Sequence, residues 1–152
     1  MDIVTPTNVT SSWLTQALQA RGVDAVVDRF DIETVGTGQL GETRRFKLHY
    51  QGTPPTDAPR SVVGKFPSDD ATAATTGKEM GFYRAELMFY KELAHRSEIN
   101  TPAVYVAELD DSNNFILLLE DLAPAVQGDH MQGCSVEQAR LALKEAALLH
   151  AA

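Results

Sequence analysis

Alternating apolar and polar positions predict strands in the first half of the chain. From position 43 the residues Phe46, Leu48 and Tyr50 alternate with polar side chains, which is the two-residue period of a half-buried strand. Similar patterns predict strands at 25–35, 60–66, 103–109 and 115–119. The acidic and amide-rich segment 110–114 separates the last two and predicts a hairpin turn.

Three stretches carry the helical period instead. Thr10 or Ser11 caps a predicted helix that runs to about Ala20, and Val9 is placed to pack on Leu14. A capping box at 76–79 predicts a long helix to Arg96, preceded by a polar, mobile connection at 67–75. Another capping box at 135–138 begins a helix whose apolar stripe continues to the last residues, so we expect a chain cut inside a larger protein.

The long helix places a carboxylate on an apolar stripe. Its spacing predicts one core-facing set, made of Phe82, Glu86, Phe89 and Leu93. A buried carboxylate requires a partner, and Lys65 on the preceding strand is the candidate. The alternative is that Glu86 lies at the edge of the stripe and reaches water.

A glycine loop connects the first two predicted strands. Gly36, Gly38 and Gly41 have the spacing G-x-G-x-x-G, but a strand follows them, whereas a dinucleotide-binding unit continues into a helix. Strand, glycine loop, strand, and then a strand with Lys65 is the arrangement that covers phosphates in kinase-type folds. The alternative is a hairpin loop that binds no ligand.

Composition narrows the classes of partner. The net charge is −8, which argues against nucleic-acid binding but leaves room for a local cationic nucleotide site. We expect no membrane span and no signal peptide. The single Cys134 is expected to be a free structural thiol in a cytoplasmic protein. Arg44 and Arg45 are interpreted as part of a solvated strand face.

Four ordered motifs resemble those of the aminoglycoside phosphotransferase and choline kinase superfamily, in its ecdysteroid-kinase-like branch and bacterial relatives. They are residues 36–43 (GTGQLGET), 61–67 (SVVGKFP), 83–90 (YRAELMFY) and 115–122 (FILLLEDL). Residues 10–14 and 148–151 are also similar to that branch. A protein kinase fragment is a weaker alternative, because the motifs at 83–90 and 115–122 match the small-molecule kinases better.

The resemblance implies an α+β fold, the N-terminal lobe of a kinase. Residues 1–122 would form this ATP-binding lobe, with a five-stranded antiparallel sheet and one long packed helix. Residues 123–152 would form a linker and the first helix of a missing second lobe. The missing lobe would hold the catalytic base, the Mg²⁺ ligands and most of the acceptor pocket.

The same resemblance implies roles for particular residues. Gly36, Gly38 and Gly41 would cover the ATP phosphates, and Lys65, held by Glu86, would contact them. Glu120 and Leu122 would belong to the hinge segment, residues 120–122, whose backbone would read the adenine edge. The adenine neighbours would be Val63 and Leu118.

The predicted function is therefore ATP binding for a small-molecule phosphotransferase that acts on a hydroxyl group. Because the catalytic base would lie in the missing lobe, no catalytic residue or metal ligand is assigned to this chain, which we expect to be inactive alone. The alternative is a non-catalytic module that binds a nucleotide or a protein. A cut chain would expose apolar surface, so we also expect self-association.

Overall fold

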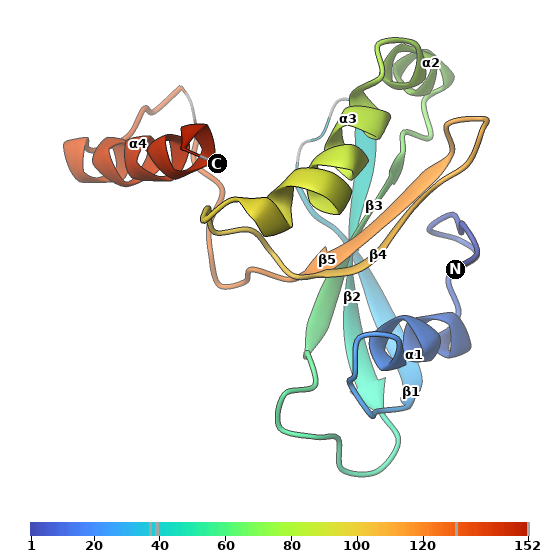
Figure 1. Ribbon diagram of the computed structural model, residues 1–152. Coiled ribbons are helices and arrows are strands. Elements are labelled where there is room, and N and C mark those ends of the chain that lie inside the picture. Colours follow the sequence, from blue (N-terminus) through green and yellow to red (C-terminus); the bar gives the residue numbers. More distant parts are fainter. Residues whose placement is uncertain (37, 39, 130, 152) are drawn as a thin grey trace.

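One antiparallel sheet organises the computed structural model, which describes residues 1–36, 38, 40–129 and 131–151. Within these residues five strands follow the order β1-β2-β3-β5-β4, and every neighbouring pair is antiparallel (Figure 1). The strands are β1 (Val27–Thr34), β2 (Gly41–Tyr50), β3 (Ser61–Pro67), β4 (Val104–Leu109) and β5 (Phe115–Glu120). The predicted α+β fold with a five-stranded antiparallel sheet is confirmed.

Helix α1 (Ser11–Gln19) covers one face of the sheet. The Thr10 hydroxyl accepts a hydrogen bond from the Trp13 N–H at 3.1 Å, which confirms Thr10 as the N-cap. Leu14 and Leu18 are fully buried and belong to the same apolar cluster as Phe46 of β2. The amphipathic pattern of α1 therefore provides one half of the core.

The two faces of the sheet contribute to separate apolar clusters. Val62 and Phe66 of β3 lie in the cluster beneath α1, whereas Leu117 and Leu119 of β5 lie in a cluster with the helix on the other side. Because side chains alternate along a strand, Lys65 is on the face opposite Phe66. We call this side of the sheet the Lys65 face.

The predicted helix 76–96 is wrong at its start and in its continuity. A helix, α2 (Ala71–Glu79), already begins after Asp70, whose carboxylate accepts from the Ala73 N–H at 2.8 Å. Thr76 is therefore inside the helix, and its hydroxyl bonds the Thr72 carbonyl instead of forming a capping box. Gly81 then interrupts the helix at φ 70°.

The helix resumes as α3 (Phe82–Met88), continues through a π-helical turn η1 (Phe89–Leu93), and ends in a 3-10 turn η2 (Ala94–Arg96). Its buried residues are Tyr83 and Leu87, whereas Phe82 is 45% exposed and Leu93 50% exposed. The predicted core stripe is therefore wrong. The restart after Gly81 sets a different phase, and the π-helical turn widens the spacing beyond four residues.

The turn between β4 and β5 is held by Asp110. Its carboxylate accepts from the backbone N–H groups of Ser112 and Asn114 at 2.9 and 2.8 Å and from the Asn114 amide at 2.8 Å. Asn113 takes the left-handed conformation that such a turn requires, with φ 57°. The predicted hairpin is confirmed.

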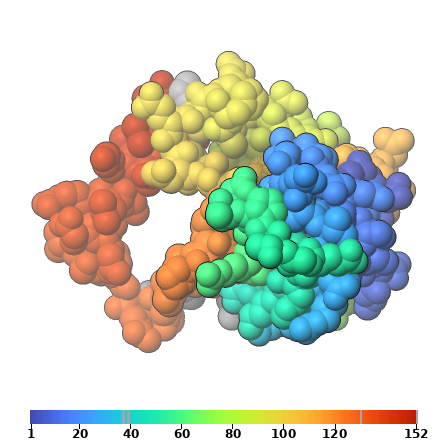
Figure 2. Space-filling view, turned by 90° about the horizontal axis from the view of Figure 1, so that it is seen from below, coloured from blue at the N-terminus to red at the C-terminus, as the bar shows by residue number. Residues whose placement is uncertain are grey.

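The last helix, α4 (Val136–His150), stands apart from the sheet. Ser135 and Gln138 form the predicted capping box, but none of residues 136–150, all of which the structure describes, is buried. We call residues 123–129 and 131–151 the arm. Figure 2 shows open space between most of the arm and the sheet, and Glu145 binds Asn100 through two hydrogen bonds of 2.9 and 2.7 Å.

Candidate functional site

The glycine loop between β1 and β2 requires glycine at two positions. Gly36 has φ 76°, a conformation that other residues rarely adopt. A Cβ at Gly38 would lie 2.8 Å from the Gly41 carbonyl oxygen, closer than such atoms approach. These two glycines are therefore explained by the loop itself, so they do not decide whether a ligand binds. Thr37 and Gln39 of the same loop lie outside the described residues.

Lys65 and Glu86 form the ion pair that the sequence predicts. Lys65 is opposite Thr43 of β2 and Leu117 of β5, and its Nζ donates to Glu86 Oε1 on α3. Each side chain retains about a third of its exposure, 33% in both cases. The pair therefore holds the lysine in place while leaving it accessible. Glu86 also reaches water, as expected from the alternative that placed it at the edge of the apolar stripe.

A cavity of about 200 Å³ joins the ion pair to the glycine loop. Four predicted site residues line it, namely Gly38, Gly41, Lys65 and Glu86. A neighbouring cavity of about 240 Å³ contains the fifth, Gly36, and shares the other two glycines. The structure thus brings five of the seven predicted site residues to one end of the sheet.

Tyr83 connects the glycine loop to the helix, which the sequence did not predict. Its hydroxyl donates to the Leu40 carbonyl and accepts from the Ser68 N–H at 3.4 Å. Its ring packs on Phe115 with 4.6 Å between centroids. Because Tyr83 lies on the buried face that the stripe prediction assigned to other residues, periodicity gave no signal for this contact.

The hinge segment begins at Glu120, the last residue of β5, at the other end of the Lys65 face. The Glu120 side chain accepts from the Ala103 N–H at 3.0 Å, and the Glu120 N–H donates to the Ala103 carbonyl at 2.8 Å, so that neither group is free for the predicted role. The Leu122 N–H has no hydrogen-bond partner among the described residues, and the Leu122 side chain is exposed. These two predicted site residues therefore lie apart from the glycine-loop cavities.

Asp121, between them, is the most constrained polar side chain of the segment. Arg45 donates to both carboxylate oxygens, from Nε at 2.6 Å and from Nη2 at 3.0 Å, and Ser61 Oγ donates at 2.6 Å. Burial disfavours the charged carboxylate, but the hydrogen bonds from Arg45, Ser61 and the Ala123 N–H outweigh it and lower the pKa of Asp121 to about 2.

Two residue interpretations from the sequence require correction here. Arg45 is not part of a solvated face, because it forms this ion pair with a carboxylate whose side chain is only 4% exposed. Leu118 is not on the Lys65 face, because it is buried in the cluster beneath α1. Strand alternation puts Leu119, opposite Val63, on the face where Leu118 was expected.

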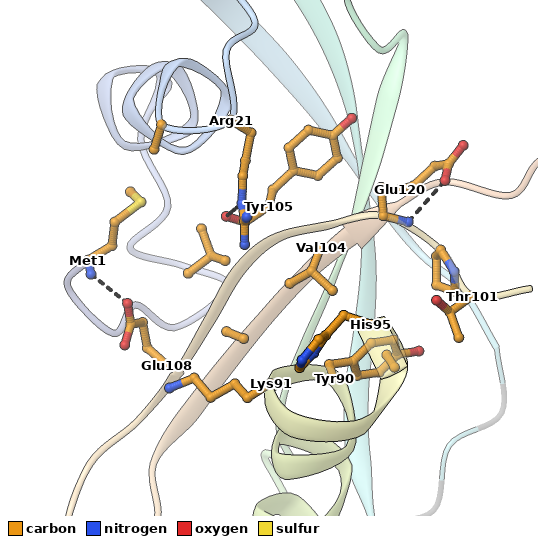
Figure 3. A pocket seen from close by; sticks show the side chains of 16 residues that line it. Met1, Arg21, Tyr90, Lys91, His95, Thr101, Val104, Tyr105, Glu108 and Glu120 are labelled. Atoms are coloured by element: carbon orange, nitrogen blue, oxygen red, sulfur yellow. Dashed lines mark hydrogen bonds and ion pairs between the residues drawn. The ribbon is translucent and has the colours of Figure 1, made fainter. Parts of the chain in front are cut away.

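A larger cavity, about 810 Å³, lies elsewhere (Figure 3). Edge strand β4 runs along it, and Arg21, Lys91, His95 and the Glu120 side chain line it. It shares no lining residue with the cavity of about 200 Å³ at Lys65. We take the smaller cavity as the candidate site, because a paired lysine and a glycine loop converge there.

The described part of the chain contains neither a cluster of metal-ligating side chains nor a membrane-spanning helix. No three His, Cys, Asp or Glu side chains gather there closely enough to hold a metal ion. No helix among these residues is long and apolar enough to cross a membrane.

No protein-family model matches the chain, and no curated protein matches its sequence closely enough to count as a relative.

Proposed function

We propose that this chain is the ATP-binding part of a small-molecule phosphotransferase, with residues 1–122 as the N-terminal lobe of a kinase-like fold. The observation that carries the proposal is the Lys65–Glu86 ion pair inside a cavity walled by the glycine loop. A lysine on the third strand, paired with a helix glutamate beneath a glycine-rich loop, is the arrangement that protein kinases use to hold ATP phosphates.

The rest of the Lys65 face fits a nucleotide. Glu120 is opposite Val62, three residues along β3 from Lys65, which separates the hinge segment from the lysine by roughly 10 Å. Val63 lies between these two points and is half-buried, so it would offer apolar surface to a base, whereas Leu119 opposite it is buried. The Leu122 N–H remains free of partners in the described chain, and a base nitrogen would accept from it.

Each residue then has a defined task. Lys65 would neutralise charge on the α- and β-phosphates, and Glu86 would keep its ammonium group aimed at them. The backbone N–H groups of the glycine loop would approach the phosphates closely. Mg²⁺, when bound, would neutralise the β- and γ-phosphates; we propose that its ligands, the catalytic base and the acceptor pocket belong to residues outside this chain.

The proposal is tested by replacing the lysine with a side chain of similar length and no charge. Lys65→Met should weaken MgATP binding at least tenfold, measured by isothermal titration calorimetry, since one charge-assisted contact is worth about 1.5–3 kcal/mol. Lys91→Ala is the control, because Lys91 is exposed and lines the larger cavity instead. The control should bind MgATP as the wild type does.

Equal affinity of Lys65→Met and wild type would contradict the assignment. Loss of binding in Lys91→Ala would move the nucleotide to the larger cavity. Thermal unfolding of each variant separates these effects from a loss of fold.

A second candidate, a protein-binding module, is favoured by the surface of α4. Val136, Leu141, Leu143 and Leu149 are all exposed apolar side chains. Such a patch is typical of a surface that another protein covers. The oligomeric state at increasing protein concentration separates the two candidates: a cut chain should self-associate, whereas a module that functions alone should stay monomeric.

A further inference from the structure

We propose that Arg45, Ser61 and Asp121 form a clamp that positions the hinge segment for the nucleotide base, and that Asp121 is its central positioning residue. We call these three residues the hinge clamp. The inference rests on the proposed function and deepens it, because it assigns base binding and phosphate binding to different parts of the sheet.

The hinge clamp ties together three segments that are distant in the sequence. Arg45 is on β2, Ser61 begins β3, and Asp121 follows β5. Arg45 is opposite Val63, so it is on the Lys65 face, at the end away from the glycine loop. Arg45, the charged partner of Asp121, is therefore supplied by the same strand that leads out of the glycine loop.

The Asp121 carboxylate is saturated with donors. It accepts two hydrogen bonds from the Arg45 guanidinium, one from Ser61, and one from the Ala123 N–H at 3.1 Å. Paired guanidinium donors fix both the position and the plane of a carboxylate. With its side chain 4% exposed, Asp121 has little freedom to exchange these donors for water.

This arrangement determines which backbone group of the hinge segment is presented. The bond from the Ala123 N–H to the Asp121 side chain closes a local turn around Leu122. The Leu122 N–H lies inside this turn and has no partner among the described residues. A donor that is held in place and left free is ready to bind an acceptor on a base.

A clamp that merely stabilised the fold would affect every ligand alike. A clamp that positions the hinge segment should affect the base and spare the phosphates, because the glycine loop and Lys65 are at the other end of the face. Two probes distinguish these roles: MgATP, which carries base and phosphates, and magnesium tripolyphosphate, which carries phosphates alone.

The test compares three variants with the wild type by isothermal titration calorimetry. Asp121→Asn and Arg45→Met should each weaken MgATP binding about tenfold, the loss expected for one misplaced hydrogen bond to a base. Their affinity for magnesium tripolyphosphate should stay within about twofold. Arg29→Met is the matched control, because Arg29 is an exposed strand arginine that pairs with Asp31, and it should change neither affinity.

Ser61→Ala keeps the test decisive if the charged variants fail to fold. It removes one donor of the clamp and should shift MgATP affinity in the same direction by a smaller factor. Hydrogen exchange gives a second readout: the amide of Ala123 should exchange faster in Asp121→Asn, while amides of β2 and β3 should not.

The outcomes separate this inference from the function on which it rests. A wild type that binds neither probe overturns both. A wild type that binds MgATP, with clamp variants that lose both probes equally or lose neither, overturns the inference and leaves the proposed function in place.

Discussion

Helices α1 and α4 have the same kind of N-cap, but only α1 packs against the sheet. Thr10 caps α1 and Ser135 caps α4, and both helices carry apolar residues at helical spacing. Four residues of α1 are buried against the sheet, whereas none of residues 136–150, all described by the structure, is buried. An N-cap residue and apolar residues at helical spacing therefore determine that a helix forms. Whether its apolar face is buried depends on the elements that pack against it.

The candidate site belongs to the sheet and its packed helix, and not to the arm. The glycine loop, Lys65 and Glu86 are attached to the sheet, whose two faces carry the apolar clusters. The arm begins at residue 123, immediately after the hinge segment. The hydrogen bonds from Arg45 and Ser61 tie Asp121 of that segment to the sheet. The sheet therefore provides the rigid support that a binding site needs, and the arm provides exposed apolar surface.

The largest effect on stability is expected when the same leucine-to-alanine substitution is made in each of the two helices. Leu18→Ala should lower the free energy of unfolding by about 2–5 kcal/mol, because it leaves a cavity in the core. Leu143→Ala should change it by less than about 0.5 kcal/mol, because Leu143 is 70% exposed. Urea denaturation measures both. Equal losses would show that α4 is packed as tightly as α1 and would remove the contrast.

A smaller effect on stability is expected at Asp121, where the sheet meets the arm. The pKa of Asp121 is about 2 in the folded protein and near 3.8 when exposed, so ionised Asp121 contributes about 2 kcal/mol to stability above pH 4. This contribution is lost as the pH falls from about 4 to 2, because the unfolded state then binds a proton that the folded state resists. Asp121→Asn should lack it.

The measurement is the difference in unfolding free energy between wild type and Asp121→Asn as a function of pH. The difference should be about 2 kcal/mol near pH 6 and should shrink toward zero near pH 2. Other carboxylates titrate equally in both proteins and cancel. A difference that does not depend on pH would mean that the charge of Asp121 plays no part in the clamp.

The smallest effect on stability is expected from a charge placed on the arm. Leu143→Glu should leave the unfolding free energy within about 0.5 kcal/mol of wild type and should reduce self-association. Sedimentation velocity over a range of concentrations measures this, with Glu137→Gln as an exposed control on the same helix. A wild type that stays monomeric at high concentration would contradict the expected association.

The sequence predicted strands and turns well because their signals are local. Alternation in β2 and the turn residues 110–114 act within a few positions, and the structure keeps both. The helix after β3 was predicted poorly because two local signals competed. Asp70 and Thr76 are both acceptable N-caps, and the earlier one begins the helix.

Part of the candidate site was also accessible from the sequence. Lys65 and Glu86 were paired from strand order and the cost of burying a carboxylate, and that pair is present although the supposed core stripe is wrong. The Arg45–Asp121 pair was not accessible, because 76 residues separate its members and neither shows a periodic pattern.

The sequence by itself determined where the five strands and the capped helices α1 and α4 form, and that glycines and a lysine accompany the first three strands. These are consequences of backbone conformation and of apolar spacing within single segments. The tertiary structure alone decided which face of α3 is buried, that Tyr83 holds the glycine loop, and that Asp121 meets Arg45 and Ser61. Such contacts depend on sheet order and register, and these bring together residues whose sequence separation carries no signal.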